Sequence, residues 1–111
     1  MIKITIYKNQ EEEYVGFQCD GHAGYDEHGS DIVCSAVSVL VLNTVNSIEK
    51  FTYDKFKSEA DDERGFVEFM FHSEPSAEAT LLLDSMILGL ESIRNTYNGE
   101  EEYLTILFKE V

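Results

Sequence analysis

Two residues that could form a nucleophilic pair lie at the ends of one glycine-rich stretch. His22 and Cys34 are twelve residues apart, within the sequence GHAGYDEHGSDIVCSAVS. A thiol with an imidazole base within hydrogen-bond reach is the arrangement that activates cysteine for attack on a carbonyl. The spacing therefore indicates a nucleophile and its base, although a core-filling thiol and an ordinary surface histidine fit the same residues.

The expected position of Cys34 in the fold adds to this interpretation. Apolar residues recur at three- and four-residue steps from Ile32 to about Lys50, which predicts a buried helix that Ser30 or Asp31 would cap. Cys34 then falls in the first turn, where unpaired amides and the positive end of the helix dipole favour thiolate over thiol. We therefore expect the pKa of Cys34 to be lowered.

Other residues of the stretch could support such a site. Asp31 can cap the helix or orient a charged histidine with its carboxylate, and Ser38 lies one helical turn beyond Cys34 on the same face. The loop between the two ends is predicted to be flexible and to admit an extended peptide, because it contains Gly21, Gly24 and Gly29.

Two further histidines leave alternatives open. His28 lies in the same loop and fits the base equally well by spacing alone, whereas His72 ends a distant strand. Cys19, His22, His28 and Cys34 could in principle bind a metal, but CxxC and HxxxH spacings are absent. We expect neither a metal nor a cofactor.

The rest of the chain predicts a scaffold around this stretch. Alternating apolar and polar residues predict strands at 2–7, 15–19, 66–72 and 102–109, with a weaker strand at 51–59 and a turn at 60–65. A second amphipathic helix opens at Pro75 and Ser76 and stops at Gly99 after Asn98. The order ββαββαβ predicts a two-layer α+β fold, with a single mixed or mainly antiparallel sheet and two helices, in one domain over residues 1–111.

Composition and charge restrict the function. The 111 residues include 8 basic and 22 acidic side chains, a formal net charge of -14 that disfavours nucleic acid and accommodates a basic protein partner. Asn43 and Asn46 interrupt the longest apolar run, so we expect no bilayer-spanning segment of roughly 20 residues. The N-terminal MIKITIYKNQ lacks the apolar core of a signal peptide, so a cytoplasmic protein with free thiols at Cys19 and Cys34 is expected.

The stretch resembles the ribosomal-processing cysteine protease family, called Prp, of Gram-positive and related bacteria. The resemblance is carried by Gly21-His22-Ala23 and by the downstream segment from Gly29 to Ser38, which match the family's GHA and G-x-D-I-V-C-x-x-V-S motifs. It implies that His22 is the catalytic base and Cys34 the nucleophile, with Asp31 and Ser38 as motif residues.

The resemblance also implies a substrate and an assembly. Proteins of this family are homodimers that remove a short N-terminal extension from a large-subunit ribosomal protein, number twenty-seven, after a phenylalanine-containing sequence. An acidic surface would steer such a basic substrate toward the enzyme. From the residues themselves two other functions stay open: a non-catalytic acidic module that binds a basic ribosomal protein, and a thiol redox sensor using Cys19 and Cys34.

Overall fold

The described part of the chain forms five strands and two helices. The computed structural model describes residues 1–27 and 29–111. Its elements are β1 (Ile2–Lys8), β2 (Tyr14–Asp20), α1 (Ile32–Phe51), β3 (Phe56–Asp61), β4 (Phe66–Phe71), α2 (Ala77–Tyr97) and β5 (Leu104–Glu110). The predicted order ββαββαβ is confirmed.

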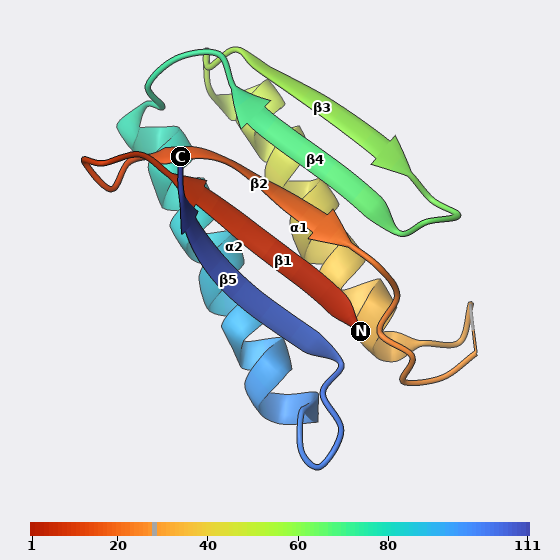
Figure 1. The fold of residues 1–111 in the computed structure, drawn as a ribbon. Coiled ribbons are helices and arrows are strands. Elements are labelled where there is room, and N and C mark those ends of the chain that lie inside the picture. The colour runs from red at the N-terminus through yellow and green to blue at the C-terminus, as the bar shows by residue number, and fades with distance from the viewer. Residues whose placement is uncertain (28) are drawn as a thin grey trace.

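The strands form one mixed sheet in the order β3-β4-β2-β1-β5. Strand β1 pairs antiparallel with β2 and parallel with β5, and the pairs β2·β4 and β3·β4 are antiparallel. Both helices cover the same face of this sheet and leave the other face open (Figure 1). The molecule therefore has the two layers expected of the α+β fold.

Alternation along the strands decides which side chains face the helices. In β1, Ile2, Ile4 and Ile6 are buried between exposed or half-buried polar neighbours. In the next two strands of the sheet, the rings of Phe17 and Phe69 stack with their centroids 5.2 Å apart. Aliphatic side chains of both helices complete this core and include Val33, Val37, Val41, Ile48, Leu83, Met86 and Leu90.

Each helix begins at a capping side chain. Asp31 caps α1, and Ser76 caps α2 by accepting a hydrogen bond from the N–H of Ala79. Such oxygens satisfy amides that the helix itself leaves unpaired, so they fix where the helices begin. Of the two candidate caps at the start of α1, Asp31 is the one the chain uses.

The start of β3 and the way α2 ends differ from the sequence prediction. The strand expected from residue 51 begins only at Phe56, because α1 continues to Phe51 and Thr52 closes it. The second helix stops where predicted, at Tyr97 with Asn98 as its C-cap, but Asn98 is extended and Gly99 is not left-handed. The side chain of Asn98 instead bonds the backbone N–H and C=O of Leu104, so a side-chain contact with the start of β5 takes the place of a glycine cap.

Within the described part of the chain, α1 is the one helix long and apolar enough to cross a membrane by length and composition alone. This differs from the expectation that no such segment exists. Its buried residues, however, recur on the face that packs on the sheet, from Val33 to Ile48. This periodicity is typical of a core helix in a two-layer fold.

Candidate active site

Cys34 lies in the first turn of α1 with its side chain half buried. The backbone N–H of Ala23 donates a hydrogen bond to its sulfur over 3.1 Å. This bond joins the two ends of the loop, because Ala23 directly follows His22. His22 and Cys34 also line the same cavity, whose volume is about 1030 Å³. The loop thus brings the two predicted residues to one site.

The carboxylate of Asp31 organises this loop. Its Oδ1 accepts from the N–H groups of Val33 and Cys34, and its Oδ2 accepts from those of Tyr25 and Asp26. Burial alone would raise the pKa of Asp31, but these four donors outweigh it and hold the pKa below its ordinary value. Asp31 is therefore an ionised helix cap that also fixes the loop.

The position of Asp31 changes the electrostatics expected at the thiol. Burial raises the pKa of Cys34, the N–H of Ala23 lowers it, and the carboxylate of Asp31 raises it, so that the net direction is upward. The prediction of a lowered pKa is therefore wrong. Burial of the sulfur is the main reason, and in addition the helix-start amides are already bonded to Asp31, which brings a negative charge to the end of the helix where the thiol lies.

His22 contacts the turn between β3 and β4. Its Nε2 lies 2.8 Å from the backbone oxygen of Glu63. Gly65 lies against the same ring, since a Cβ on Gly65 would be 3.1 Å from Cε1 of His22 and 2.5 Å from the carbonyl oxygen of Gly21. The N–H of Gly21 in turn donates to the carbonyl of Gly65. The sequence predicted a turn at 60–65 but gave no signal that it would pack on His22.

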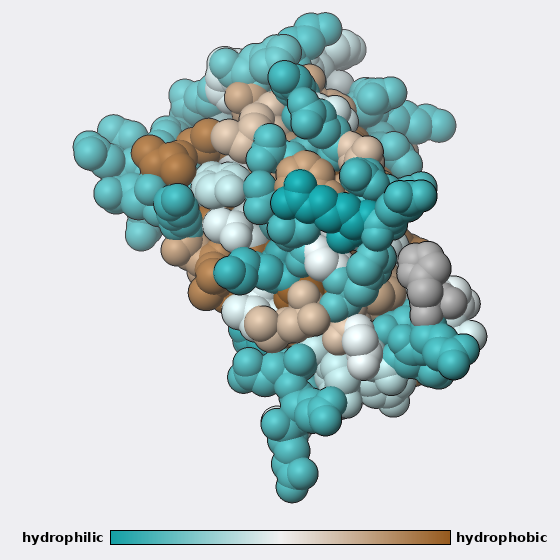
Figure 2. All heavy atoms as spheres, turned by 45° about the vertical axis from the view of Figure 1, so that its right-hand side comes forward, coloured by the Kyte–Doolittle hydropathy of each residue, from teal (hydrophilic) through white to brown (hydrophobic). Residues whose placement is uncertain are grey.

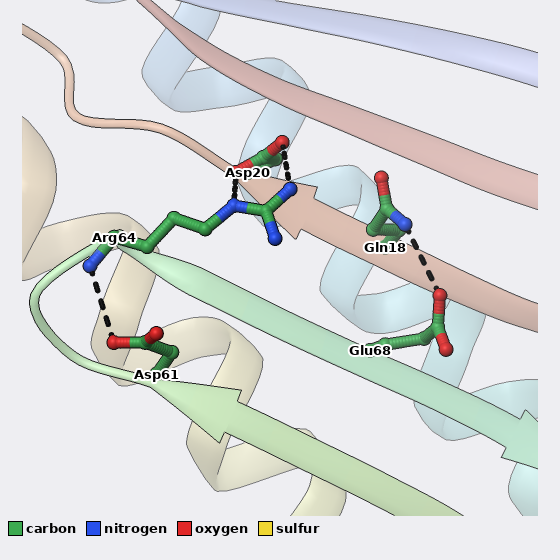
Figure 3. A network of polar contacts seen from close by, with 5 residues as sticks. All are labelled: Gln18, Asp20, Asp61, Arg64 and Glu68. Carbon is green, nitrogen blue, oxygen red and sulfur yellow. Dashed lines mark hydrogen bonds and ion pairs between the residues drawn. The ribbon is translucent and has the colours of Figure 1, made fainter.

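Charged side chains hold that turn to the end of β2 (Figure 3). The guanidinium of Arg64 donates from Nε and Nη2 to the two carboxylate oxygens of Asp20, over 3.2 and 3.0 Å. Asp61 caps the turn by accepting from the N–H groups of Glu63 and Arg64. Because Asp20 lies two residues before His22, this ion pair ties the turn to the strand that leads into the site.

Aromatic contacts of Tyr25 also hold the loop between His22 and Cys34 in place. The ring of Tyr25 packs edge-on against Tyr97 at the end of α2 and Tyr103 before β5, with centroids 5.5 and 5.1 Å apart. Gly21, Gly24 and Gly29 adopt positive φ angles, which fit a tightly curved loop. Its predicted flexibility stays a prediction.

Apolar and acidic side chains both line the cavity. Val37, Val41 and Phe66 contribute apolar surface, and Ser38 lines the cavity one turn beyond Cys34. The acidic lining residues include Asp26, Asp61, Asp62 and Glu63. Figure 2 shows a predominantly hydrophilic surface with smaller apolar areas on the side turned to the viewer. Such a cavity fits a peptide that carries both apolar and basic side chains.

Two alternatives to a Cys34–His22 site were left open by the sequence. Among the residues that the structure describes, no group of three or more His, Cys, Asp or Glu side chains is placed to hold a metal ion. His28, the rival base, lies outside the described residues. His72 follows β4 beyond Phe71, and the cavity lining does not include it.

Comparison with known proteins decides the class of this site. A family model described as cysteine protease Prp matches residues 1–102. The chain belongs to the Prp family of cysteine proteases. The resemblance carried by the segments around His22 and Cys34 is thereby confirmed, and with it the activity class of a cysteine protease, a hydrolase of peptide bonds.

Relatives in the Prp family span nearly the whole chain. The ribosomal processing cysteine protease Prp of Staphylococcus aureus (strain Mu50 / ATCC 700699) is 33% identical over 98 residues, which cover 88% of this chain and 92% of that protein. The protein of the same name from Bacillus subtilis (strain 168) is 32% identical over 101 residues, or 87% and 90% of the two chains.

Solved structures of Prp proteins have the same fold as this chain. The essential ribosomal processing protease Prp from S. aureus, crystallised with a covalently linked product peptide, matches with a TM-score of 0.90 and 31% identity over 98% of this chain and 100% of that chain. Its complex with a substrate peptide matches with a TM-score of 0.85 and 30% identity over the same shares.

Proposed function

We propose that Cys34 is the nucleophile and His22 the general base of a Prp-family endopeptidase that spans residues 1–111 as one domain. The observation that carries the proposal is the 3.1 Å hydrogen bond from the N–H of Ala23 to the sulfur of Cys34. It ties the thiol to the residue next to His22, on a cavity that both side chains line. This arrangement supports a nucleophile, a base and room for a peptide at one site.

The reaction begins from a neutral thiol. Because the pKa of Cys34 is raised, the resting enzyme holds S–H rather than thiolate, and His22 takes this proton as the sulfur attacks the scissile carbonyl. The resulting imidazolium then protonates the leaving amine, and the acyl group stays on sulfur as a thioester. Water attacks the thioester with His22 again as base, which releases the acid and restores the thiol.

The oxyanion of the tetrahedral intermediate needs donors near the sulfur. The amides of Val33 and Cys34 at the helix start would be the expected donors, but Asp31 already accepts from both. The N–H of Ala23 is directed at the sulfur itself. We assign it to the oxyanion, since a small shift of the loop moves this donor from sulfur to an adjacent oxygen.

The substrate that fits best is a basic ribosomal protein with an N-terminal extension. The S. aureus and B. subtilis relatives are named ribosomal processing proteases, and the family resemblance implies large-subunit protein number twenty-seven. The net charge of -14 and the acidic lining residues Asp61 and Asp62 favour a cationic chain. The apolar lining that includes Phe66 would take a hydrophobic side chain before the scissile bond.

The test uses the precursor of that ribosomal protein from the same bacterium. Wild-type enzyme should shorten it by the length of the extension, whereas Cys34→Ser should bind it with similar affinity and leave it uncut. Mass spectrometry gives the product and surface plasmon resonance gives the affinity. Cleavage that persists in Cys34→Ser contradicts the assignment of the nucleophile.

A homodimer in the cytoplasm is part of the same proposal. Large apolar side chains on the two helices are exposed, among them Val39 at 67%, Leu81 at 68% and Leu88 at 67%. Exposed apolar surface of this kind favours self-association. Sedimentation equilibrium of wild type and Leu88→Glu measures it, and a wild-type monomer at micromolar concentration would exclude the dimer.

One rival function has a structural feature to weigh. Cys19 and Cys34 are both free thiols, as a redox pair would be in its reduced state. Burial, the carboxylate of Asp20 and the nearby Cys34 raise the pKa of Cys19 to about 12. Little of this thiol is therefore ionised at neutral pH. This disfavours a sensor disulfide, and mass analysis of oxidised protein under non-reducing conditions would detect one.

A further inference from the structure

The β3–β4 turn holds His22 through a backbone oxygen. The contact is made by the backbone oxygen of Glu63, 2.8 Å from Nε2. A carbonyl oxygen can only accept a hydrogen bond, so Nε2 must carry the proton. In a neutral imidazole the other nitrogen, Nδ1, is then unprotonated and is the ring atom that can accept a proton.

We infer that the β3–β4 turn is a positioning element for the proposed base, in which the Glu63 carbonyl selects the Nε2–H tautomer and leaves Nδ1 to take the proton of Cys34. The inference rests on the proposed Cys34–His22 pair and adds which nitrogen reacts and what fixes it. The thiol proton moves from Sγ to Nδ1 and later from Nδ1 to the leaving amine. Nε2–H stays bonded to Glu63 throughout and stabilises the imidazolium.

Three contacts give the turn a defined position. Arg64 makes the bidentate pair with Asp20, Gly21 donates to the carbonyl of Gly65, and Asp61 caps the turn from within. The guanidinium also lies over the ring of Phe66, 4.3 Å from its centroid. A forked donor held on an aromatic face is a directional contact that lysine does not reproduce.

Arg64 is suited to act through the turn rather than on the substrate. Its ion pair is solvent-exposed, with 58% of the Arg64 side chain and 34% of the Asp20 side chain accessible, so its contribution to global stability is small. The cavity lining includes Glu63 and Gly65 but not Arg64. Loss of this pair should therefore move the turn without unfolding the protein.

Gly65 is the second residue that fixes the position of the turn. Its φ of +68° and the 2.5 Å approach of a Cβ to the carbonyl of Gly21 exclude a side chain at this position. A methyl group here would push the turn away from Gly21 and from the ring of His22. Gly65→Ala should therefore break the contact between Glu63 and His22 more completely than a change at Arg64.

The first test is spectroscopic and does not depend on activity. Long-range proton–nitrogen correlation spectra of nitrogen-15-labelled protein distinguish the two histidine tautomers, and His22→Gln identifies the resonances of His22. We expect the Nε2–H tautomer in wild type and a mixture of tautomers in Arg64→Gln. The Nδ1–H tautomer in wild type would overturn the inference.

The second test is kinetic and uses a matched control. Arg64→Gln should lower kcat about tenfold, with KM changed less than about twofold. The kcat of Arg64→Lys should lie between that of Arg64→Gln and that of wild type. Gly65→Ala should lower kcat about a hundredfold. Lys57→Gln removes the same charge from another exposed pair, with Glu59 at 3.6 Å, and should keep wild-type kcat. Equal kcat in Arg64→Gln and wild type contradicts the inference.

The two failures are separable. If His22→Gln and Cys34→Ala both cleave like wild type, the proposed function fails. If both are inactive but Arg64→Gln and Gly65→Ala retain wild-type kcat and tautomer, only the positioning inference fails. Melting temperatures of all variants show whether a loss of activity comes from unfolding, and Arg64→Gln remains informative if Gly65→Ala does not fold.

Discussion

The N–H of Ala23 donates to the sulfur of Cys34 over 3.1 Å, which closes the loop between the two catalytic candidates with a bond to the nucleophile itself. Cys34 also lies at a helix start whose amides already bond Asp31. The thiol therefore rests in an environment that favours its protonated form, in contrast to the thiolate expected at an open helix N-terminus.

Thiol reactivity should follow from this environment. Burial and Asp31 raise the pKa of Cys34. The pH at which alkylation of Cys34 by iodoacetamide reaches half its maximal rate should therefore lie above the ordinary cysteine pKa of about 8.5. In Asp31→Asn the midpoint should fall, because the negative charge is gone. Mass spectrometry of peptides containing Cys34 follows the reaction. A wild-type midpoint well below 8.5 would contradict the neutral resting thiol.

Asp31 should also stabilise the folded protein, by an amount that depends on pH. Asn at this position keeps one acceptor oxygen for four N–H groups, so Asp31→Asn should cost about 1–3 kcal/mol in the free energy of unfolding near pH 7. Asp31 has a lowered folded-state pKa, so its stabilisation is present above the unfolded pKa of about 3.9 and is lost as pH falls through the folded value.

Urea unfolding at several pH values tests this linkage. The difference between wild type and Asp31→Asn should be constant from neutral pH to about pH 5 and shrink below about pH 4. Asp31→Ala should cost at least as much as Asp31→Asn near pH 7. A difference that grows on acidification would show that the carboxylate is not the stabilising form.

Tyr25 should control the order of the loop. Tyr25→Ala removes both edge contacts with Tyr97 and Tyr103, worth about 0.5–1.5 kcal/mol each, and should speed hydrogen exchange at residues 24–27. Tyr53→Ala is the control, because Tyr53 is a tyrosine that is 101% exposed. Equal exchange in the two variants would mean that Tyr25 does not anchor the loop.

Much of the fold was predictable from the sequence, because its signals are local. The alternation of Ile2, Ile4 and Ile6 and the helical spacing of Val33, Val37 and Val41 identify strand and helix from neighbouring residues alone. The start of β3 was predicted too early, because α1 continues to Phe51. The stop of α2 at Asn98 was predicted, but its bond to Leu104 was not, because that bond depends on how the connection to β5 folds.

The candidate site shows the same division. His22 and Cys34 were predictable from residue type, spacing and resemblance, and the structure brings them to one cavity. The contact of the turn at Glu63 and Gly65 with His22 was not predictable, because the turn reaches His22 only through the pairing of β2 with β4. The raised pKa of Cys34 was not predictable either, because it depends on how far the sulfur is buried and on the distance of the Asp31 carboxylate, which residue spacing does not give.

Ionic strength should affect substrate capture. If the charge of -14 steers a basic substrate, kcat/KM should fall as salt rises from about 0.1 M to about 1 M, where the Debye length shrinks from about 10 Å to about 3 Å. The loss should come mainly from KM. A peptide with its lysines replaced by glutamine should show little salt dependence. Equal salt dependence for both peptides would contradict electrostatic steering.

The central claim is that Cys34 carries the acyl group during peptide hydrolysis, and trapping that intermediate tests it most directly. Acid quenching of wild-type enzyme during turnover of a cleavage-site peptide, followed by mass spectrometry, should reveal a thioester of the N-terminal fragment on Cys34. Cys34→Ala should give neither adduct nor product, and His22→Ala should form both about 100 to 10,000 times more slowly. Product formed by Cys34→Ala at the wild-type rate, with no adduct on any wild-type peptide containing Cys34, would contradict the account.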